Sequence, residues 1–327
     1  SQLSRQLNWN TLTPPNFPIG ASSRELGMNT NRAEYLTHDG VMTSEISDLL
    51  IDIPDGIFID ATYGYGSHFK YFKKDHNNID LLAIDRDLEA VNNSSDSHNV
   101  QHYSFSKIKE FIENNNIKSI SGVFYDFGLS THQIDSPHRG FSFQHDSILD
   151  MRMDVSQDLS AREVINNYGY EELLKVFYEY GEESNSKKIA ESIINNRPIQ
   201  TTSELVSIIE SSLPRQNPKF TKSTVRKIFQ AIRIEVNNEI NEIIESVEAV
   251  KNYIKSNGVM IFLSYHSIED RTVKQFIDKE TKGCICDPKL AICICENVPL
   301  FKLGKYKKRK PSNNEIKKNP RSKSAVL

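Results

Sequence analysis

The sequence predicts an α/β protein in which an all-helical domain interrupts a parallel sheet, and three observations support this fold. Between residues 56 and 128, short apolar segments alternate with amphipathic ones, which is the pattern of βαβ units. From Ser136 to about Glu235, only helical patterns follow one another. A strand of the buried type returns at residues 257–267, so the helical stretch is an insertion into the α/β part.

The elements are expected in a regular order along the chain. A short amphipathic helix is ended by Pro54 and Gly56. The strands that follow are expected at residues 56–60, 80–85, 100–105 and 120–128, with helices at 68–75, 87–93 and 106–115. The insertion should contain helices at residues 161–169, 170–183, 186–197, 202–213 and 224–236, and a last helix at 268–280 follows the returning strand. Thr201 and Glu204 form a capping-box pair at the start of one of the inserted helices.

These patterns divide the chain into five segments. They are a disordered N-terminal segment at 1–33, a first α/β part at 34–135, the inserted helical domain at 136–235, a second α/β part at 236–300 and a basic tail at 301–327. Residues 1–33 are polar, contain three prolines and show no apolar periodicity, and Met28 could be the native start.

Composition and charge limit the class of protein. With 327 residues, 38% apolar and 25% charged, the chain has the composition of a soluble globular protein. No run approaches the roughly 20 apolar residues of a membrane helix, and residues 1–20 lack the apolar segment of a secretory signal, so we expect a cytoplasmic protein. Residues 301–327 hold ten Lys or Arg residues and one Glu. Such a tail either contacts a polyanion such as nucleic acid or is a solvated, disordered end.

A glycine-rich turn follows the first expected strand, in FIDATYGYGSH at residues 58–68. Gly64 and Gly66 let the chain turn sharply and bring its backbone close to a ligand, because no Cβ intervenes. The third glycine of the dinucleotide fingerprint is missing, since Phe69 and Lys70 stand in its place. The turn therefore gives little support for a nicotinamide or flavin site.

Three aspartates, Asp60, Asp85 and Asp126, stand at the ends of expected strands. In a doubly wound sheet, ligands lie over these ends, and an acid after the second strand accepts hydrogen bonds from a ribose diol. Three carboxylates suit a pyrophosphate poorly but suit a cationic nucleoside, of which S-adenosylmethionine is the common example. Taken singly, Asp60 or Asp126 could cap a helix or turn, and His68 could be an ordinary surface residue.

Longer motifs make the chain resemble the RsmH (MraW) family from about Tyr35 to the C-terminus. The motifs are FIDATYGYGSH, LLAIDRD, YDFGLSTHQIDSPHRGFSFQHDSILDMRMD, YGEESNSKKIAESI, RKIFQAIRIEVNNEI, FLSYHSIEDRTVKQF and NPRSKSAVL. That family transfers a methyl group from S-adenosylmethionine to the N4 amino group of a cytidine in the decoding region of bacterial small-subunit ribosomal RNA. The resemblance implies a Rossmann-like methyltransferase domain with an inserted helical domain, and the RNA of the small ribosomal subunit as partner.

The resemblance also implies a set of cofactor contacts. They are Gly66, Ser67, His68, Asp85, Phe105, Asp126 and Gln133. The family usually has Gly-Gly-His where this chain has Gly66, Ser67 and His68. If that position requires a positive φ, the serine is strained by roughly 1–2 kcal/mol. A ribosome-assembly factor that has lost catalysis through such changes, and a methyltransferase acting on a DNA or protein amine, are the competing functions.

Methylation of an exocyclic amine requires an in-line approach and an acceptor for an N–H hydrogen bond. Asp126, in DFGLS, is the first candidate to orient the amine, and His266, in SYHSIEDR, is the second. The alternative for the second motif is that Ser267, Glu269 and Asp270 merely begin the last helix.

Candidate contacts to RNA follow the fourth strand and continue in the insertion. Arg139 and Arg152, interleaved with Phe141 and Phe143, suit an unstacked base and its phosphates, with the arginines outward and the phenylalanines inward. The phenylalanines could instead pack the junction between the domains. In the insertion, the expected phosphate contacts are Arg226, Lys227 and Arg233. The insertion could also be a structural brace or the surface of a homodimer.

Four cysteines form two C-x-C pairs, at residues 284–286 and 293–295. This spacing is not that of a zinc knuckle, so no metal is predicted, although four thiols within twelve residues could bind Zn²⁺. Reduced thiols in a cytosolic loop are the main alternative, and a disulfide is the other.

Overall fold

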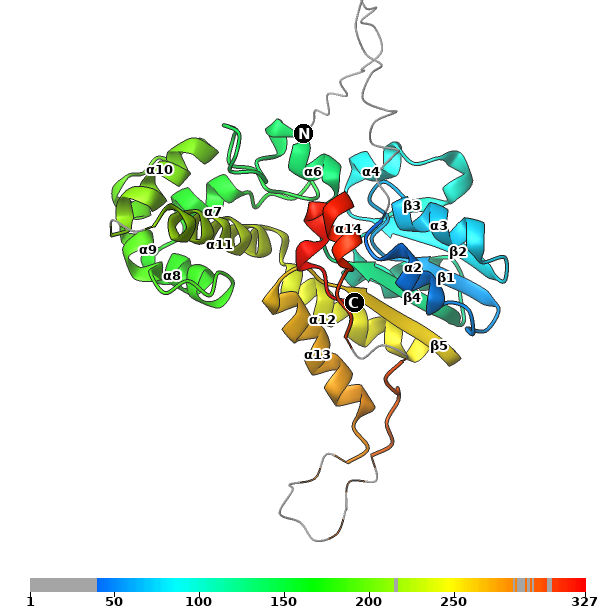
Figure 1. Ribbon diagram of the computed structural model, residues 1–327. Coiled ribbons are helices and arrows are strands. Elements are labelled where there is room, and N and C mark those ends of the chain that lie inside the picture. The colour runs from blue at the N-terminus through cyan, green and yellow to red at the C-terminus, as the bar shows by residue number, and fades with distance from the viewer. Residues whose placement is uncertain are drawn as a thin grey trace, which may run out of the picture.

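The computed structural model describes residues 40–214, 217–284, 286, 292, 295, 297–304 and 308–327. It places an α/β domain beside an all-helical lobe (Figure 1). The expected disorder of residues 1–33 and the suggested start at Met28 lie outside the described residues.

The described strands form one five-stranded sheet, and every pairing in it is parallel, as predicted. The strands are β1 (Gly56–Asp60), β2 (Ile79–Asp85), β3 (Val100–His102), β4 (Ile120–Asp126) and β5 (Ile254–Leu263), in the order β3-β2-β1-β4-β5. β3 ends earlier than predicted, because Phe105 begins the 3₁₀ helix η3 (Phe105–Lys107). Since β2, β1 and β4 are neighbours, their terminal aspartates lie along one edge of the sheet.

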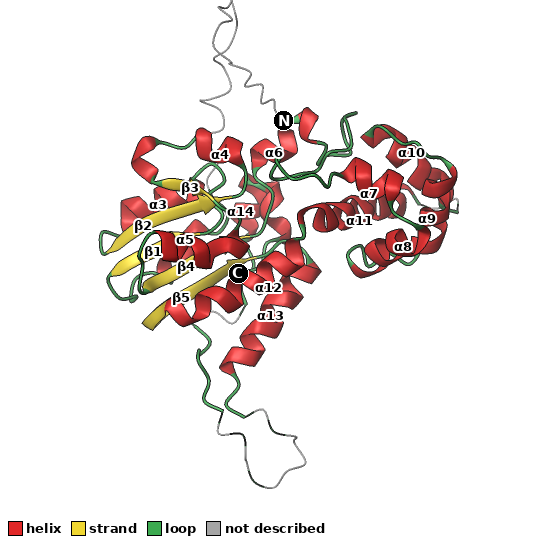
Figure 2. Ribbon diagram, turned by 180° about the vertical axis from the view of Figure 1, so that it is seen from behind, coloured by secondary structure: helices red, strands yellow, loops and turns green. Residues whose placement is uncertain are grey.

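Different helices cover the two faces of the sheet (Figure 2). On one face, Phe58 and Phe124 pack against Phe72 of α3 (Ser67–Asp75) and against α2 (Thr43–Asp48). On the other face, Ile59 and Tyr125 pack with α5 (Ile108–Asn114), α12 (Glu239–Val250) and α13 (Ser267–Thr281). Successive residues of a strand point to opposite faces, which explains why Phe58 and Ile59 enter different cores.

Helix α12 is missing from the elements that we expected from the sequence, although it is well formed. Ile243, Val247 and Val250 recur at helical spacing along it and are buried. The remaining short elements are α4 (Leu88–Asn92), α6 (Thr131–Asp135), α14 (Asn313–Lys318), η2 (Asp96–His98), η4 (Pro137–Arg139), η5 (Lys251–Tyr253) and η6 (Pro320–Ser324).

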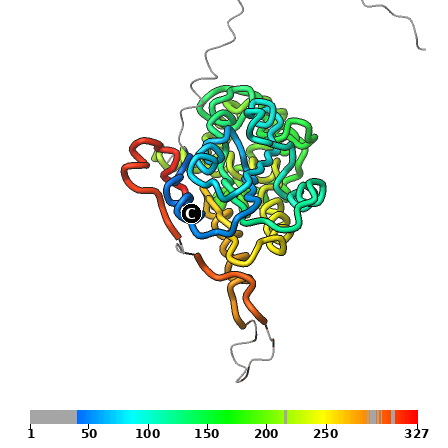
Figure 3. Tube along the Cα trace, turned by 90° about the vertical axis from the view of Figure 1, so that its right-hand side faces the viewer, coloured from blue at the N-terminus to red at the C-terminus, as the bar shows by residue number. Residues whose placement is uncertain are grey.

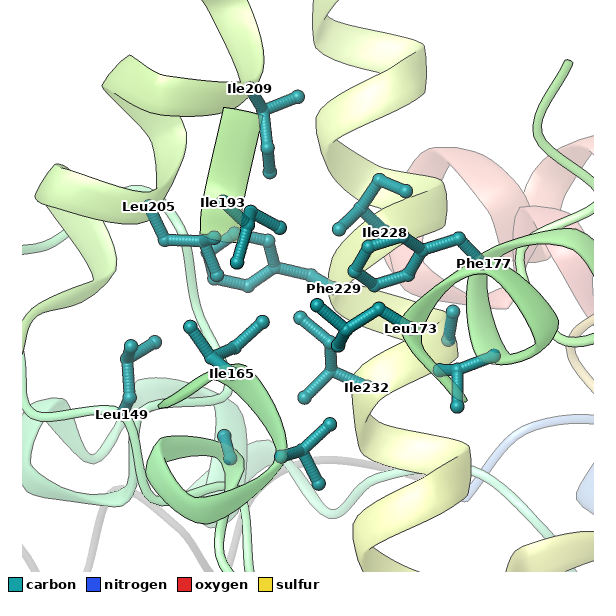
Figure 4. Close-up of a cluster of buried hydrophobic side chains, with 14 of the residues drawn as sticks. Leu149, Ile165, Leu173, Phe177, Ile193, Leu205, Ile209, Ile228, Phe229 and Ile232 are labelled. Atoms are coloured by element: carbon teal, nitrogen blue, oxygen red, sulfur yellow. The ribbon is translucent and has the colours of Figure 1, made fainter. Parts of the chain in front are cut away.

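The helical lobe has its own hydrophobic core. Its helices are α7 (Ala161–Asn167), α8 (Tyr170–Glu179), α9 (Ser186–Asn195), α10 (Thr202–Ser212) and α11 (Pro218–Asn237). Leu173, Phe177, Ile228 and Ile232 are fully buried and gather between α8 and α11 (Figure 4). The capping box of Thr201 with Glu204 is present, as predicted. α11 begins earlier than expected, with Pro218 at its first position, where the ring disrupts no helical hydrogen bond.

The C-terminal segment, residues 308–327, packs onto the α/β domain beside α2 (Figure 3). Val326 exchanges two backbone hydrogen bonds with Ser264, and Ala325 is fully buried. Glu315 accepts a hydrogen bond of 2.6 Å from the backbone N–H of Met42. This segment is therefore not the solvated, disordered end that was one alternative for the basic tail, because its last apolar residues add to the core beside β5.

Candidate active site

A cavity of about 820 Å³ opens at the carboxyl edge of the sheet, between the α/β domain and α11. The C-terminal segment contributes Asn319, Arg321 and Ser324 to its lining. Predicted site residues that line it are Ser67, His68, Asp85, Phe105, Asp126, Gln133, Phe141, Arg226, Lys227, Arg233 and His266. Gly66, Arg139 and Arg152 do not line it.

The glycine-rich turn after β1 has the conformation that only glycine adopts readily. Gly64 and Gly66 have φ angles of +55° and +72°. A Cβ on Gly66 would lie 2.6 Å from the Tyr63 hydroxyl oxygen, whereas one on Gly64 would meet only Ser130, at 3.9 Å. Gly66 is thus required for packing of the turn, while Gly64 presents bare backbone to the cavity.

The condition for strain at Ser67, a positive φ, is not met. Ser67 is the first residue of helix α3, and its φ is not among the positive values of the chain. The left-handed conformation falls on Gly64 and Gly66 instead. A serine at the start of a helix costs little, so this departure from the family pattern gives no reason to expect a damaged site.

Asp85 joins the end of β2 to the glycine-rich turn. Its Oδ2 accepts a hydrogen bond of 2.6 Å from the Gly64 N–H, and its Oδ1 accepts one of 2.8 Å from the Asp87 N–H. Burial raises the pKa of Asp85 to about 6, although the two N–H groups lower it. Each carboxylate oxygen retains a second lone pair, so Asp85 can still accept hydrogen bonds from a ligand in the cavity.

Asp126 is held by groups from three parts of the chain. His68 Nδ1 lies 3.6 Å from its Oδ2, Tyr265 hydrogen-bonds to its side chain, and the Gly128 N–H lies 3.4 Å from its Oδ1. Burial raises the pKa of Asp126, while His68, Tyr265 and Gly128 lower it. His68 is itself buried, and its Nε2 lies 2.8 Å from the Val41 carbonyl oxygen, so the alternative of an ordinary surface histidine is wrong.

Asp60 lies below the cavity and does not line it. Only 1% of the residue is exposed, and its Oδ1 accepts a hydrogen bond from the Thr62 N–H at 3.2 Å. Its Oδ2 has no partner among the described residues. Burial raises the pKa of Asp60 to about 8, and Asp126 and Asp85 raise it further. The turn-capping alternative therefore describes Asp60 best, and its burial favours the protonated form of the side chain.

Gln133, which lines the cavity, and Arg139, which does not, belong to one buried polar network. The Gln133 side chain donates to Asp87 Oδ2 at 2.8 Å and accepts from the Ser130 N–H at 3.1 Å. Arg139 is 4% exposed, with Nη2 at 2.9 Å from Asp87 Oδ2 and Nη1 at 3.0 Å from Glu89 Oε2. The prediction that Arg139 points outward to RNA is wrong, because its guanidinium compensates the buried Asp87.

The aromatic candidates Phe105, Phe141 and Phe143 line the cavity and also pack against neighbouring apolar side chains. Phe105 contacts Tyr125 and Phe127 with ring centroids 6.0 and 5.9 Å apart. Phe141 is 9% exposed and belongs to the core of the helical lobe. Phe143 packs edge-on against Phe229 of α11. The inward orientation predicted for the two phenylalanines after β4 is confirmed, and both pack against the core of the helical lobe.

His266 begins helix α13 and is tied to Glu269. Its Nδ1 accepts a hydrogen bond from the Glu269 N–H at 3.3 Å, and Glu269 Oε2 accepts from the Tyr265 and His266 N–H groups. Glu269 is completely buried, and its Oε1 lies 2.9 Å from His266 Nε2 and 3.5 Å from Arg233 Nη2. The helix-start alternative therefore accounts for this motif, although His266 also faces the cavity.

The predicted RNA-binding cations differ sharply in their surroundings. Arg233 makes two hydrogen bonds, of 2.7 and 2.8 Å, with the buried Glu239, so its guanidinium is engaged inside the fold. Arg152 is held by Asp150 and by the carbonyl oxygens of two residues of its own loop. Lys227 donates to the Glu182 carbonyl oxygen at 3.0 Å. Arg226 is exposed at the cavity and is the one best placed to meet a phosphate.

Two residues that face Asp126 or the turn were not singled out as site residues from the sequence. Tyr265 stands in the SYHSIEDR motif, but nothing in its local pattern shows that its hydroxyl reaches β4. Asp87 follows Asp85 by two residues and looks like a helix cap, which it is, with Oδ1 accepting from the Glu89 N–H. Its further contacts to Gln133 and Arg139 depend on the fold.

Comparison with known proteins identifies the family. Residues 35–327 match the MraW methylase family. A "Ribosomal RNA small subunit methyltransferase H" of Caldicellulosiruptor bescii is 41% identical over 300 residues, which cover 89% of this chain and 97% of that protein. Proteins of the same name from Halothermothrix orenii and Clostridioides difficile are 37% and 36% identical, each over 89% of this chain and 97% of the relative.

No helix in the described part of the chain has both the length and the apolar character needed to cross a membrane. The parallel sheet, the glycine-rich turn and the strand-end acids fit a methyltransferase of Rossmann-like fold with helical additions. This chain belongs to the MraW methylase family.

Proposed function

We propose that this chain transfers a methyl group from S-adenosylmethionine to the N4 amino group of a cytidine in the decoding region of small-subunit ribosomal RNA. The observation that carries the proposal is the cavity at the ends of three adjacent strands, with the Gly64 turn, Asp85 and Asp126 at one edge. The names of the curated relatives support ribosomal RNA as substrate.

The residues around the cavity fit the proposed cofactor. Gly64 leaves open space where a side chain would otherwise stand, and the carboxylate of Asp85 can accept from a ribose diol. Asp126 adds negative charge near the cavity, which favours a cation over a phosphate. When bound, S-adenosylmethionine supplies an electrophilic methyl group on its sulfonium.

Asp126 is suited to orient the target amine. In its ionised form it can only accept hydrogen bonds, and Tyr265, His68 and Gly128 hold its oxygens in place. An N–H of the amine that donates to Asp126 aligns the nitrogen for attack, and Asp126 can take the proton as the nitrogen becomes positively charged. His266 precedes α13 and does not take the proton in this scheme. It helps to position Glu269, which in turn accepts a hydrogen bond from the Tyr265 N–H.

The experiment that tests the substrate class uses the purified chain with S-adenosylmethionine labelled in its methyl group. We expect label in the RNA of small ribosomal subunits. Label only in DNA or only in protein would overturn the proposed substrate, and binding to subunits without any transfer would favour the assembly-factor alternative.

Asp85→Ala is expected to weaken S-adenosylmethionine binding by about 1–3 kcal/mol, the cost of losing hydrogen bonds to a charged acceptor. Because burial raises the pKa of Asp85 to about 6, the affinity of the unchanged protein should also fall as the pH drops below about 6. Isothermal titration calorimetry measures both effects. Asp80→Ala, at an exposed position at the other end of β2, is the matched control, and equal affinities for the two variants would refute the ribose contact.

Arg226→Ala is expected to reduce affinity for small-subunit RNA and to lower the slope of log K against log[salt] by about one unit, as one phosphate contact is lost. Cofactor affinity should not change, because Arg226 is exposed on α11. Lys188→Ala, exposed on α9 and outside the cavity lining, is the control. An unchanged salt slope for Arg226→Ala would remove this part of α11 from the RNA site.

A further inference from the structure

Three cysteine side chains converge after helix α13. The Sγ atoms of Cys284, Cys286 and Cys295 all lie within 4.8 Å of one another, and Cys284 Sγ and Cys295 Sγ are 3.9 Å apart. That separation is far longer than a disulfide bond of about 2.05 Å. Two thiolates on one tetrahedral zinc ion, each about 2.3 Å from the metal, stand roughly 3.8 Å apart. The observed distance fits two ligands on a shared metal, as well as an S–H···S contact between two thiols.

The three cysteines lie between residues 282 and 297, and hydrogen bonds join the two ends of this stretch. Leu300 and Phe301 donate backbone hydrogen bonds of 3.0 and 3.1 Å to the Glu280 carbonyl oxygen, near the end of α13. Asn297 donates from its side chain to the Lys282 carbonyl oxygen at 2.8 Å. Figure 2 shows the described residues that directly follow α13 continuing beyond the end of that helix. Cys284 and Cys286 lie on the outgoing arm and Cys295 on the returning arm.

Apolar packing among the described residues does not explain why the thiols gather. Ile292 and Val298 are 76% and 81% exposed, and Leu300 is 52% exposed. None of the hydrophobic core clusters of the described residues includes a residue between 282 and 300. Short segments that bury so little apolar surface are commonly stabilised by a metal or a disulfide.

A second group of possible ligands, Glu239, His266 and Glu269, offers a useful contrast. Arg233 lies 2.7 Å from Glu239 and 3.5 Å from Glu269, so a cation already compensates both carboxylates. The cluster after α13 offers three sulfur atoms instead of carboxylate oxygens. Sulfur ligands favour zinc over the hard cations magnesium and calcium.

We propose that Cys284, Cys286 and Cys295 bind a structural zinc ion that clamps the two arms of the segment between α13 and the C-terminal segment. The thiols lose their protons when they bind the metal. Cys293 lies outside the described residues and is not assigned. The zinc ion would bind just before the C-terminal segment in the sequence. That segment contributes Asn319 and Arg321 to the cavity lining.

The test measures metal in the full-length chain, purified without a polyhistidine tag from cells grown with added zinc and then dialysed. Mass spectrometry of the metal content should find about one zinc ion per chain. Cys284→Ser together with Cys295→Ser should reduce this to under about 0.1, whereas Ser267→Ala, outside the segment, should leave it unchanged. Zinc retained by the double variant would place the ion elsewhere and overturn the proposal.

A second measurement uses only the unchanged protein, so it remains informative even if the double variant does not fold. The unchanged protein is stripped of zinc and loaded with Co²⁺, and its absorption spectrum is recorded. Thiolate-to-cobalt charge transfer and the strong d–d bands of tetrahedral cobalt are expected. A spectrum without charge-transfer absorption would refute ligation by these cysteines, as would less than about 0.1 zinc per chain in the unchanged protein.

Discussion

Asp126→Asn is expected to lower kcat for methyl transfer by about 10²–10⁴-fold, the range typical of losing a positioned proton acceptor. The amide keeps the size of the carboxylate but cannot accept the proton of the amine. Tyr265 and Gly128 can still hydrogen-bond to the amide oxygen, so the end of β4 should keep its shape. Single-turnover methylation of small subunits, with cofactor affinity measured separately, checks this prediction.

Asp60→Asn is the matched control for Asp126→Asn. It changes a neighbouring strand-end aspartate that is buried and does not line the cavity. Its rate should stay within severalfold of that of the unchanged protein. Similar losses in both variants would show that a change at either buried strand-end aspartate lowers the rate, and that the position of Asp126 is not decisive.

The rate of the unchanged protein should depend on pH through the same residue. Burial raises the pKa of Asp126 above its ordinary value of 3.8, so the ionised form disappears at a higher pH than for an exposed aspartate. Activity should therefore fall as the pH drops through this raised pKa. A rate that stayed constant down to the pKa of an ordinary aspartate would contradict a proton-accepting role for Asp126.

Arg139→Ala is expected to destabilise the protein by about 3–5 kcal/mol, the usual cost of removing one partner from a buried ion pair. Asp87 is 5% exposed and would be left with an uncompensated charge, and the carbonyl oxygens of Arg152 and Met153 would lose their donor. The free energy of unfolding, obtained from urea denaturation at fixed pH, measures the loss.

Arg162→Ala is the control for this prediction, because Arg162 is exposed on α7 and should change stability by less than about 0.5 kcal/mol. Asp87→Asn combined with Arg139→Met should cost less than the sum of the two single changes, since both charges are then removed. A loss below about 1 kcal/mol for Arg139→Ala would show that the buried network contributes little.

The α/β architecture could be predicted because its signals are local. The strand segments are short apolar runs between turn residues, and their order alternates with helices. α12 shows equally clear helical periodicity but is absent from the predicted helices. The packed C-terminal segment could not be predicted in this way. Its many lysines suggest solvation, while its attachment depends on the pairing of Val326 with Ser264, far away in the sequence.

The candidate site was predictable where function follows from position on the sheet. Asp85 and Asp126 end β2 and β4, the two strands that flank β1, and both line the cavity, as expected from their places in the chain. Charge alone did not show which of these cations are exposed. Arg139 and Arg233 find buried carboxylates on other elements, and only the fold distinguishes them from the exposed Arg226. Strain at Ser67 depended on a positive φ, which the residue lacks because helix α3 begins one residue earlier than the pattern indicated.

The most direct test of the proposed function is the identity of the methylated nucleoside. Small ribosomal subunits that have not been methylated at the decoding region are incubated with the purified chain and S-adenosylmethionine, and their RNA is digested to nucleosides and analysed by mass spectrometry. N4-methylcytidine from a single position in the decoding region should appear with the unchanged protein and be nearly absent with Asp126→Asn. Methylation at a ring carbon, at a ribose oxygen or on another base would contradict the account.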